Sequence, residues 1–327
     1  MGKKLITILF LLAVVTGLFY LFIKISTKSG SSNLNLLSPI QKATEQVKSR
    51  FGKTINVLLI GTDTSIARRN RGQRGFNTDS LILVSINTET KRVLLTSVPR
   101  DLWINGNKIN ALYTVYDDKT LIDAFEKITG HKIDGYIRVD FDQFEWIINA
   151  FGGVPATVLN TFTDNQFPNR NDNGAITVTF TQGDETMDGE RALTFARSRK
   201  GNNGEGSDLM RAKRQHLILQ AMVKGVSQPA SQFWPMVISD FYNALINQGI
   251  STTLSLEDAT YLWNFYKDRD KYTVESFVIG DKYIYYPGMY PQSEYRAWVF
   301  VPRDSTFEQL HKDIQAKLDG TYVEPTP

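Results

Sequence analysis

Arginines gather in two segments of the sequence, and their type and spacing first suggest a chemistry. Segment 63–79 reads DTSIARRNRGQRGFNTD, and segment 191–214 reads RALTFARSRKGNNGEGSDLMRAKR. Arg100 lies between them, directly after an apolar run that predicts a buried strand. Arginine is favoured over lysine where a planar fork of donors must hold phosphate. The two segments therefore predict a phosphate site, whereas a solvated charged surface is the simpler explanation of any single arginine.

The second arginine segment distributes its side chains over a helix end, a loop and a helix start. Arg197 and Arg199 flank the end of one predicted helix, and a loop rich in Gly and Asn follows them. Arg211 and Arg214 are three residues apart on the next predicted helix, so they share a face near its N-terminus. Because the N-terminus of a helix favours anions, this placement also indicates phosphate.

Two aspartates flank the first arginine segment. Asp63 follows the C-terminal end of one predicted strand and Asp79 opens the next, so the two carboxylates could face one another. Mg²⁺ binds through one or two carboxylates together with substrate phosphates. A magnesium site and two ordinary Asp–Arg ion pairs are both compatible with this spacing.

Composition excludes several other kinds of site. The 327 residues contain no cysteine, which rules out disulfides, thiolate metal sites and Cys nucleophiles. The three histidines, at 131, 216 and 311, share no metal-ligand spacing. The net charge of +3 comes from the first 24 residues, which hold three lysines and no acid, and the remaining 34 basic and 34 acidic residues balance. The chain is therefore not a generally basic nucleic-acid binder.

The N-terminus predicts a membrane anchor. Residues 5–23 form an uncharged run that would span roughly 28 Å as a helix, close to the thickness of a bilayer core. A cleaved signal peptide is the alternative, but the run ends in bulky residues rather than small ones. We expect a single-pass protein with a cytoplasmic stub at 1–4, a transmembrane helix at 5–23, a tether and juxtamembrane segment at 24–51, and an extracytoplasmic folded part.

Beyond residue 52, strand patterns alternate with helix patterns. Strands are predicted at 54–60, 79–86, 91–98, 133–139, 154–159, 175–180, 272–279 and 298–301. Helices are predicted at 118–129, 141–151, 188–197, 208–223, 233–246, 256–266 and 306–318. The turn 87–90 makes a hairpin, and Asp188 and Asp208 are placed to cap helices. This order predicts a three-layer α/β/α sandwich with a central mixed sheet over 52–320 and a tail at 321–327. The sequence leaves open whether residues 227–327 form a separate domain, and we expect them to complete the same sandwich.

Six segments carry a specific resemblance. They read NVLLIGTD (56–63), NTDSLILVSINTETKRVLLTSVPRD (77–101), KINA (108–111), GYIRVDFDQFEWIINAFGGV (135–154), GDETMDGERALTFARSR (183–199) and SDLMRAKRQ (207–215). In this order, after one N-terminal anchor, they resemble the LytR-CpsA-Psr family of membrane-anchored bacterial phosphotransferases, with a best-matching core at 54–226.

The resemblance implies a function. The family moves a glycan-1-phosphate from a polyprenyl-pyrophosphate carrier to a peptidoglycan hydroxyl outside the membrane. The expected partners are therefore a polyprenyl-pyrophosphate-linked glycan, peptidoglycan and the cell membrane, with no nucleic acid. An apolar tunnel between the sheet and the helices is expected for the lipid, but the sequence does not identify its lining.

The resemblance also implies site residues. Asp63 and Asp79 match the family's Mg²⁺-associated aspartates, and together with Arg100 they are the predicted catalytic residues. The predicted substrate-binding residues are Arg74, Lys108, Arg197, Arg199, Asp208, Arg211, Arg214 and Gln215.

The sequence departs from the family pattern in the first arginine segment. Many relatives have Arg where Asn77 stands, and Arg soon after the first Asp, where this chain has Thr64 and Ser65. Arg68, Arg69 or Arg74 could replace the missing arginines, and the sequence does not decide among the three.

A polyprenyl-pyrophosphate phosphatase and a non-catalytic lipid-phosphate-binding regulator are the alternative functions.

Overall fold

The computed structural model describes residues 50–150, 152–170, 173–225, 249–255, 258, 261–262, 271–288 and 298–324. The predicted membrane helix at 5–23, nearly all of the tether and the helix predicted at 233–246 lie outside these residues, as does most of the helix predicted at 256–266. No helix in the described part of the chain is long and apolar enough to cross a bilayer.

The centre of the fold is a six-stranded mixed sheet, as predicted. Its order is β11-β6-β1-β2-β3-β12. The strands are β1 (Thr54–Thr62), β2 (Thr78–Asn87), β3 (Arg92–Ser97), β6 (Gly135–Val139), β11 (Ser251–Thr252) and β12 (Thr273–Val278). Antiparallel pairs join β1 to β2, β2 to β3 and β6 to β11, while β1–β6 and β3–β12 are parallel. The predicted hairpin is β2–β3, and β12 shows that the C-terminal part completes the same sheet.

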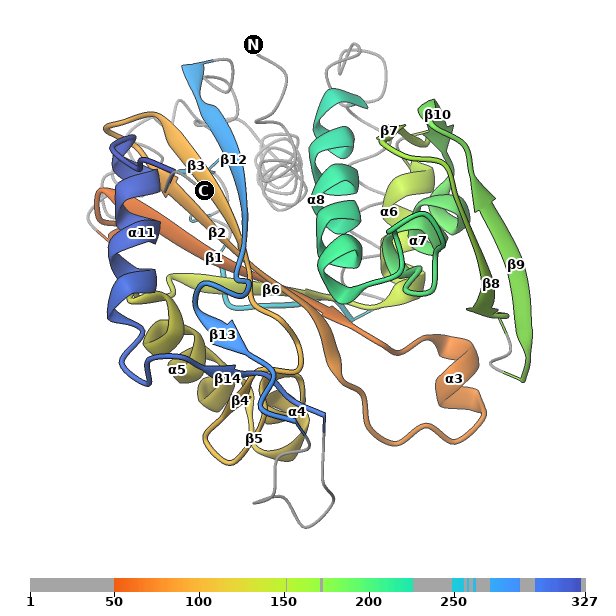
Figure 1. Cartoon of the computed structure of the whole chain (residues 1–327), viewed down its shortest axis with the longest axis horizontal. Coiled ribbons are helices and arrows are strands. Elements are labelled where there is room, and N and C mark those ends of the chain that lie inside the picture. The colour runs from red at the N-terminus through yellow and green to blue at the C-terminus, as the bar shows by residue number, and fades with distance from the viewer. Residues whose placement is uncertain are drawn as a thin grey trace, which may run out of the picture.

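Helices cover both faces of this sheet (Figure 1). The first face packs against α4 (Ile109–Val115), α5 (Asp118–Thr129) and α11 (Glu308–Asp319) through a core that includes Leu58 and Leu83. The neighbouring residues Val57 and Val84 point to the opposite face, because side chains alternate along a strand. There α8 (Asp208–Gly225) packs beside α7 (Gly189–Arg197), which packs on α6 (Phe141–Ala150).

Short hairpins and helices, several of which the sequence did not reveal, complete the described part. The remaining elements are α3 (Ile66–Asn70), β4 (Trp103–Ile104), β5 (Asn107–Lys108), β7 (Val154–Val158), β8 (Phe162–Pro168), β9 (Ala175–Phe180), β10 (Gly183–Met187), β13 (Ile284–Tyr285) and β14 (Val301–Pro302). They form the antiparallel pairs β4–β5, β7–β10, β8–β9 and β13–β14. Two-residue strands have no periodicity that a sequence pattern could show.

A bulge in β2 sets the direction of one candidate catalytic side chain. Gly61 of β1 pairs with Ser80, and Thr62 pairs with Thr78, so Asp79 is the extra residue between them. Such a bulge re-aims a side chain at the edge of a ladder. A Cβ atom on Gly61 would lie 2.9 Å from Ser80 Cβ, so a glycine is required where the two strands approach.

The helix caps confirm one sequence prediction and correct another. The Asp188 side chain accepts from the backbone N–H of Arg191 at the start of α7, as expected. At the start of α8 the cap is Ser207, whose Oγ accepts from Met210 N at 3.1 Å. The prediction of Asp208 as the cap was wrong, because its carboxylate is turned toward neighbouring arginines.

Candidate functional site

A cavity of about 530 Å³ opens between the sheet and helices α6, α7 and α8. Its body is apolar, and its aliphatic and aromatic lining includes Ile82, Ile137, Phe144, Ile147, Leu193, Ile218 and Leu219. Charged and polar side chains also line it, among them Asp63, Arg68, Asp79, Ser80, Arg197, Arg199, Lys200, Arg211 and Gln215. The cavity therefore combines an apolar interior with a strongly charged part, and this combination fits an amphiphile with an anionic head group.

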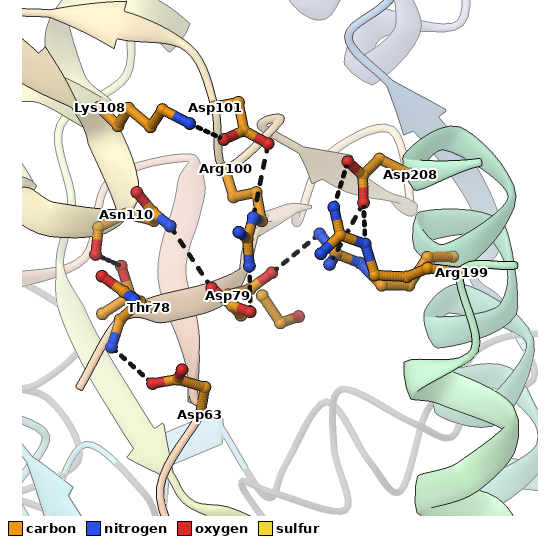
Figure 2. Close-up of polar contacts among 12 residues, drawn as sticks. Asp63, Thr78, Asp79, Arg100, Asp101, Lys108, Asn110, Arg199 and Asp208 are labelled. Atoms are coloured by element: carbon orange, nitrogen blue, oxygen red, sulfur yellow. Dashed lines mark hydrogen bonds and ion pairs between the residues drawn. The ribbon is translucent and has the colours of Figure 1, made fainter. Parts of the chain in front are cut away.

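The predicted catalytic residues lie together at the ends of neighbouring strands (Figure 2). Arg100 Nη1 binds the Asp79 carboxylate, and Arg100 Nε lies 3.4 Å from Asp101 Oδ2. Asn110 Nδ2 donates to the other oxygen of Asp79 at 3.4 Å. Arg100 is thus held between two carboxylates and fixes the orientation of the bulged Asp79.

Asp63 lies beside this pair, and its surroundings disfavour its ionised form. Its Oδ1 accepts from Asn77 N at 2.6 Å, and its Oδ2 lies 3.6 Å from Arg68 Nη1. Burial raises the pKa of Asp63, and the negative charge of Asp79 raises it further, although the bond from Asn77 and the charge of Arg68 oppose this. Two carboxylates that repel one another at the edge of a cavity can both be stabilised by a bound cation.

These two carboxylates fit Mg²⁺ only as a site that the substrate completes. The described residues contain no group of three or more His, Asp or Glu that could hold a metal. Mg²⁺ commonly binds through one or two carboxylates and takes its other ligands from water and phosphate. Asp63 and Asp79 supply such a pair, and burial together with the charge of Asp79 raises the pKa of Asp63, an effect that a bound cation would oppose.

A second ionic cluster comes from the loop before α8 and from α8 itself. Arg199 Nη2 donates to Asp208 Oδ2 at 2.9 Å. Asp208 Oδ1 lies at ion-pair distance from Arg199 Nε, 2.9 Å, and from Arg211 Nη1, 3.2 Å. Although burial disfavours the charged form, Arg211 and Arg199 outweigh it and hold the pKa of Asp208 below its usual value. Arg211 Nη2 also donates to the backbone oxygen of Asp79 at 3.3 Å, which joins the two clusters.

Arg211 carries positive charge that its neighbours only partly offset. Its side chain is buried, and among the described residues Arg211 Nε has no hydrogen-bond partner. Burial lowers the pKa of Arg211, and the charges of Arg199 and Arg100 lower it too, against the opposing effect of Asp208 and Asp79. An anion in the cavity would relieve both the unpaired donor and the repulsion among the arginines.

Two further arginines make cation–π contacts with the same aromatic ring. The guanidinium carbons of Arg197 and Arg68 lie 4.1 and 5.3 Å from the centroid of the Phe141 ring. Arg68 Nη1 also donates to the backbone oxygen of Asp63, and both arginines line the cavity. Of the three loop arginines that could replace the family's missing ones, Arg68 is the one that lines this cavity.

Gln215 is the remaining predicted residue that lines the cavity. Its Oε1 accepts from Ser80 Oγ at 3.0 Å, and its Nε2 reaches the backbone oxygen of Ala196 at 3.5 Å. Gln215 therefore ties the strand next to the bulge to the end of α7 and orients the surroundings of Asp79.

Four predicted substrate-binding residues do not line the cavity. One is Asp208, which orients Arg199 and Arg211. Lys108 binds Asp101 at 2.6 Å and contributes through Arg100 rather than to the cavity lining. Arg74 is exposed and lines a second, smaller pocket. Arg214 is only 1% exposed, and its guanidinium is used up by Glu205.

The prediction of Arg214 as a substrate ligand is therefore corrected. Its Nε and both Nη atoms donate to the backbone oxygens of Phe195, Glu205 and Ser198, and its Nη1 lies 2.6 Å from Glu205 Oε2. The guanidinium also lies 4.8 Å from the centroid of the Phe162 ring. Arg214 holds the loop before α8 against α7.

The structure adds residues that the sequence argument did not select. Asn110 and Asp101 orient Asp79 and Arg100, and Ser80 binds Gln215. Phe141 supports two arginines. The signal for Asn110 and Asp101 was present, since both stand in the family-like segments at 77–101 and 108–111, but nothing in the residue pattern showed that they face Asp79.

Comparison with known proteins identifies the family of the chain. The model described as the LytR_cpsA_psr family matches residues 19–310. The polyisoprenyl-teichoic acid–peptidoglycan teichoic acid transferase TagV of Bacillus subtilis (strain 168) is 26% identical over 277 residues, which cover 82% of this chain and 66% of TagV. The transferase TagT of the same strain is 26% identical over 255 residues, which cover 75% of this chain and 74% of TagT.

Solved structures show the same fold. The crystal structure of B. subtilis TagV matches with a TM-score of 0.58 at 26% identity and covers 82% of this chain and 99% of that one. A structure of TagT bound to LI-WTA matches with a TM-score of 0.58 at 25% identity and covers 81% of this chain and 91% of that one. With the family model matched over most of its length, the chain belongs to the LytR-CpsA-Psr family.

Proposed function

We propose that this protein transfers a glycan-1-phosphate from a polyprenyl-pyrophosphate carrier to a hydroxyl of peptidoglycan. The observation that carries the proposal is one cavity with an apolar body whose polar part is lined by Asp63, Asp79 and four arginines. The relatives TagV and TagT, named as teichoic acid transferases, support the same reaction class.

The apolar body of the cavity suits the isoprenoid chain. It lies between β1, β2 and β6 on one side and helices α6 to α8 on the other. Each buried methylene contributes about 0.8 kcal/mol, so even a few isoprene units placed there bind strongly. The chain would fill the interior with its pyrophosphate at the arginines, which is the tunnel expected from the family resemblance.

The arginines would hold the pyrophosphate and neutralise its charge. Arg199 and Arg211 are oriented by Asp208, while Arg68 and Arg197 are supported by Phe141. These four side chains are fixed before the substrate arrives, which limits the reorganisation needed as charge shifts between the two phosphates.

The reaction exchanges one phosphorus–oxygen bond for another. The acceptor hydroxyl oxygen attacks the phosphorus bonded to the glycan, the bond from this phosphorus to the bridging oxygen breaks, and polyprenyl phosphate leaves. The hydroxyl proton is released. Arg100 binds Asp79 and would keep it aimed at the reacting phosphates.

Asp63 and Asp79 are the residues that would hold Mg²⁺. Bound there with the pyrophosphate, the ion would supply charge neutralisation on the phosphate oxygens. Residues 5–23 would anchor the protein as a single-pass membrane protein with its catalytic domain outside the cell. That location would place the cavity beside the bilayer that carries the lipid-linked donor.

The products distinguish the proposal from its alternatives. The full chain is incubated with a radiolabelled lipid-linked glycan and Mg²⁺, with and without peptidoglycan. We expect label in peptidoglycan and release of polyprenyl phosphate only when the acceptor is present. Release of glycan phosphate or inorganic phosphate to water would indicate a phosphatase, and lipid binding without turnover would indicate a regulator. Either result would overturn the proposed transfer.

A further inference from the structure

A second pocket, of about 300 Å³, adjoins the first at the C-terminal ends of β1 and β6. Thr62 and Asp140 line both pockets. Because Asp63 stands between Thr62 and Thr64, which also lines the second pocket, this space begins next to a candidate catalytic carboxylate. A group bound here would be close to the reacting phosphates.

The second pocket has an excess of positive charge. Three arginines and one acid line it, namely Arg69, Arg74, Arg138 and Asp140. Asp140 is already used, because its Oδ2 binds Arg69 Nη1 at 3.0 Å and its Oδ1 accepts from Gln143 N at 2.9 Å. Within the described residues neither Arg74 nor Arg138 has a carboxylate at ion-pair distance. Two cationic side chains are thus left to offer to a ligand.

Arg138 is held in place without being neutralised. Its guanidinium lies 5.3 Å from the centroid of the Phe76 ring and 5.2 Å from that of Tyr113, and its Nη1 donates to Tyr113 Oη at 3.0 Å. These neutral aromatic partners fix the orientation of the Arg138 guanidinium, but they leave its charge and its other N–H donors available. This arrangement suits an anion and not a structural ion pair.

The rest of the lining suits a sugar. Phe76 offers an aromatic surface, and Gln73, Gln143 and Thr64 add amide and hydroxyl groups. Aromatic faces pack against the C–H faces of pyranose rings, while amides and hydroxyls bond sugar hydroxyls. The volume accommodates about one sugar unit with its substituent.

We propose that this second pocket binds an anionic sugar unit, a glycosyl group carrying a phosphate or carboxylate, beside the reaction centre. The inference rests on the proposed function for the identity of the neighbouring site. The unit belongs either to the transferred glycan or to the acceptor strand, because both must approach Asp63. Arg74 and Arg138 then select for charged over neutral glycans.

Binding of simple sugars tests this proposal. The full chain is saturated with geranylgeranyl pyrophosphate to fill the first cavity, and N-acetylglucosamine 6-phosphate or N-acetylglucosamine is then titrated by calorimetry. We expect the phosphorylated sugar to bind at least about tenfold more tightly than the neutral one, the scale of one charge-assisted hydrogen bond. Equal affinities of the two sugars would overturn the proposal.

Paired arginine variants locate the effect. Arg74→Gln should weaken binding of the sugar phosphate about tenfold while leaving that of the neutral sugar unchanged. Arg71→Gln is the matched control, because Arg71 is exposed in the same loop and lines neither pocket. Arg138→Lys keeps the charge and should give a smaller loss than Arg138→Gln. Wild-type affinity in Arg74→Gln and Arg138→Gln would contradict the assignment.

Steady-state kinetics then identify the source of the anionic unit. A higher KM for the lipid-linked donor in Arg74→Gln assigns the pocket to the transferred glycan, and a higher KM for peptidoglycan assigns it to the acceptor. Failure of geranylgeranyl pyrophosphate to bind would count against the proposed function instead. In that case the sugar titrations are carried out on the free chain, where the same expectations hold.

Discussion

Arg211 and Arg214 lie one turn apart on α8, yet their surroundings are opposite. Arg211 is 7% exposed and lines the cavity, and its Nε has no hydrogen-bond partner in the described part of the chain. Arg214 is 1% exposed and donates to Glu205 and three backbone oxygens. Burial alone does not separate a ligand-binding arginine from a structural one. The difference lies in whether the buried donors are already satisfied.

The same contrast holds for two aspartates. Asp164 is 1% exposed, and it accepts from Ser198 Oγ and from the backbone N–H groups of Gln166, Arg199 and Lys200. Burial raises its pKa, but these hydrogen bonds outweigh burial and leave the pKa lowered. Asp63 at the reaction centre has a raised pKa. The two aspartates line the same cavity, but the fold satisfies Asp164 with hydrogen bonds, whereas at Asp63 burial and the charge of Asp79 outweigh the bond from Asn77 and the charge of Arg68.

Removal of Arg214 should have the largest effect on folding. Arg214→Ala leaves Glu205 buried without its partner and should lower the free energy of unfolding by about 3–5 kcal/mol, measured by urea denaturation. The double variant Arg214→Met with Glu205→Gln removes both charges and should recover much of this loss. If Arg214→Ala were as stable as the wild type, the structural role of Arg214 would be wrong.

Removal of Arg211 should affect catalysis and spare the fold. Arg211→Gln deletes a charge that faces the pyrophosphate and should lower the transfer rate about 10²–10³-fold, the scale for loss of one transition-state charge partner. Its free energy of unfolding should stay the same or rise, since an unsatisfied buried donor is removed. If Arg211→Gln were strongly destabilised but transferred at the normal rate, Arg211 would be a structural arginine like Arg214.

The pH dependence of stability gives the smallest effect and the finest test. Asp164 has a native pKa below its unfolded value, so its contribution is complete above the unfolded pKa and is lost as pH falls through the native pKa. Asp63 has a raised native pKa, so its ionised form costs stability at neutral pH, and this cost disappears as pH falls through that pKa.

Two asparagine variants measure these opposite signs. Asp63→Asn should be more stable than the wild type at pH 7, and Asp164→Asn less stable. The Asp63 difference should shrink as the pH is lowered toward 4, whereas the Asp164 difference should persist until the pH falls below the unfolded pKa of about 3.9. Thermal unfolding at several pH values provides the measurement. A loss of stability in Asp63→Asn at pH 7 would show that Asp63 is a structural carboxylate like Asp164.

The sequence predicts the regular part of the fold well. Strands β1, β2 and β3 are long apolar runs with clear ends, and α5 and α7 begin at capping aspartates, so local patterns suffice. The bulge at Asp79 was not predictable, because it depends on the register between two strands and not on either strand alone. The strands β4 and β5 were not predicted, because two residues are too few to show the alternation of apolar and polar side chains that marks a strand.

The sequence predicted which types of residue lie near the cavity, but it predicted less well which way their side chains point. Spacing places Arg211 and Arg214 on one face, and only the fold shows that the loop carrying Glu205 closes over Arg214. The choice of Arg68 over Arg69 likewise depends on α3, a short helix capped by Ser65 that turns Arg68 back toward Asp63. Arg69 instead binds Asp140.

The proposed function requires that the arginines that line the cavity hold the pyrophosphate of a lipid-linked glycan. A crystal structure of the protein with a polyprenyl pyrophosphate tests it most directly. We expect the isoprenoid chain to pack against Ile82, Phe144 and Leu219, and the phosphates to lie within hydrogen-bond distance of Arg199 and Arg211. Phosphates bound away from these arginines, or a lipid outside the cavity, would contradict it.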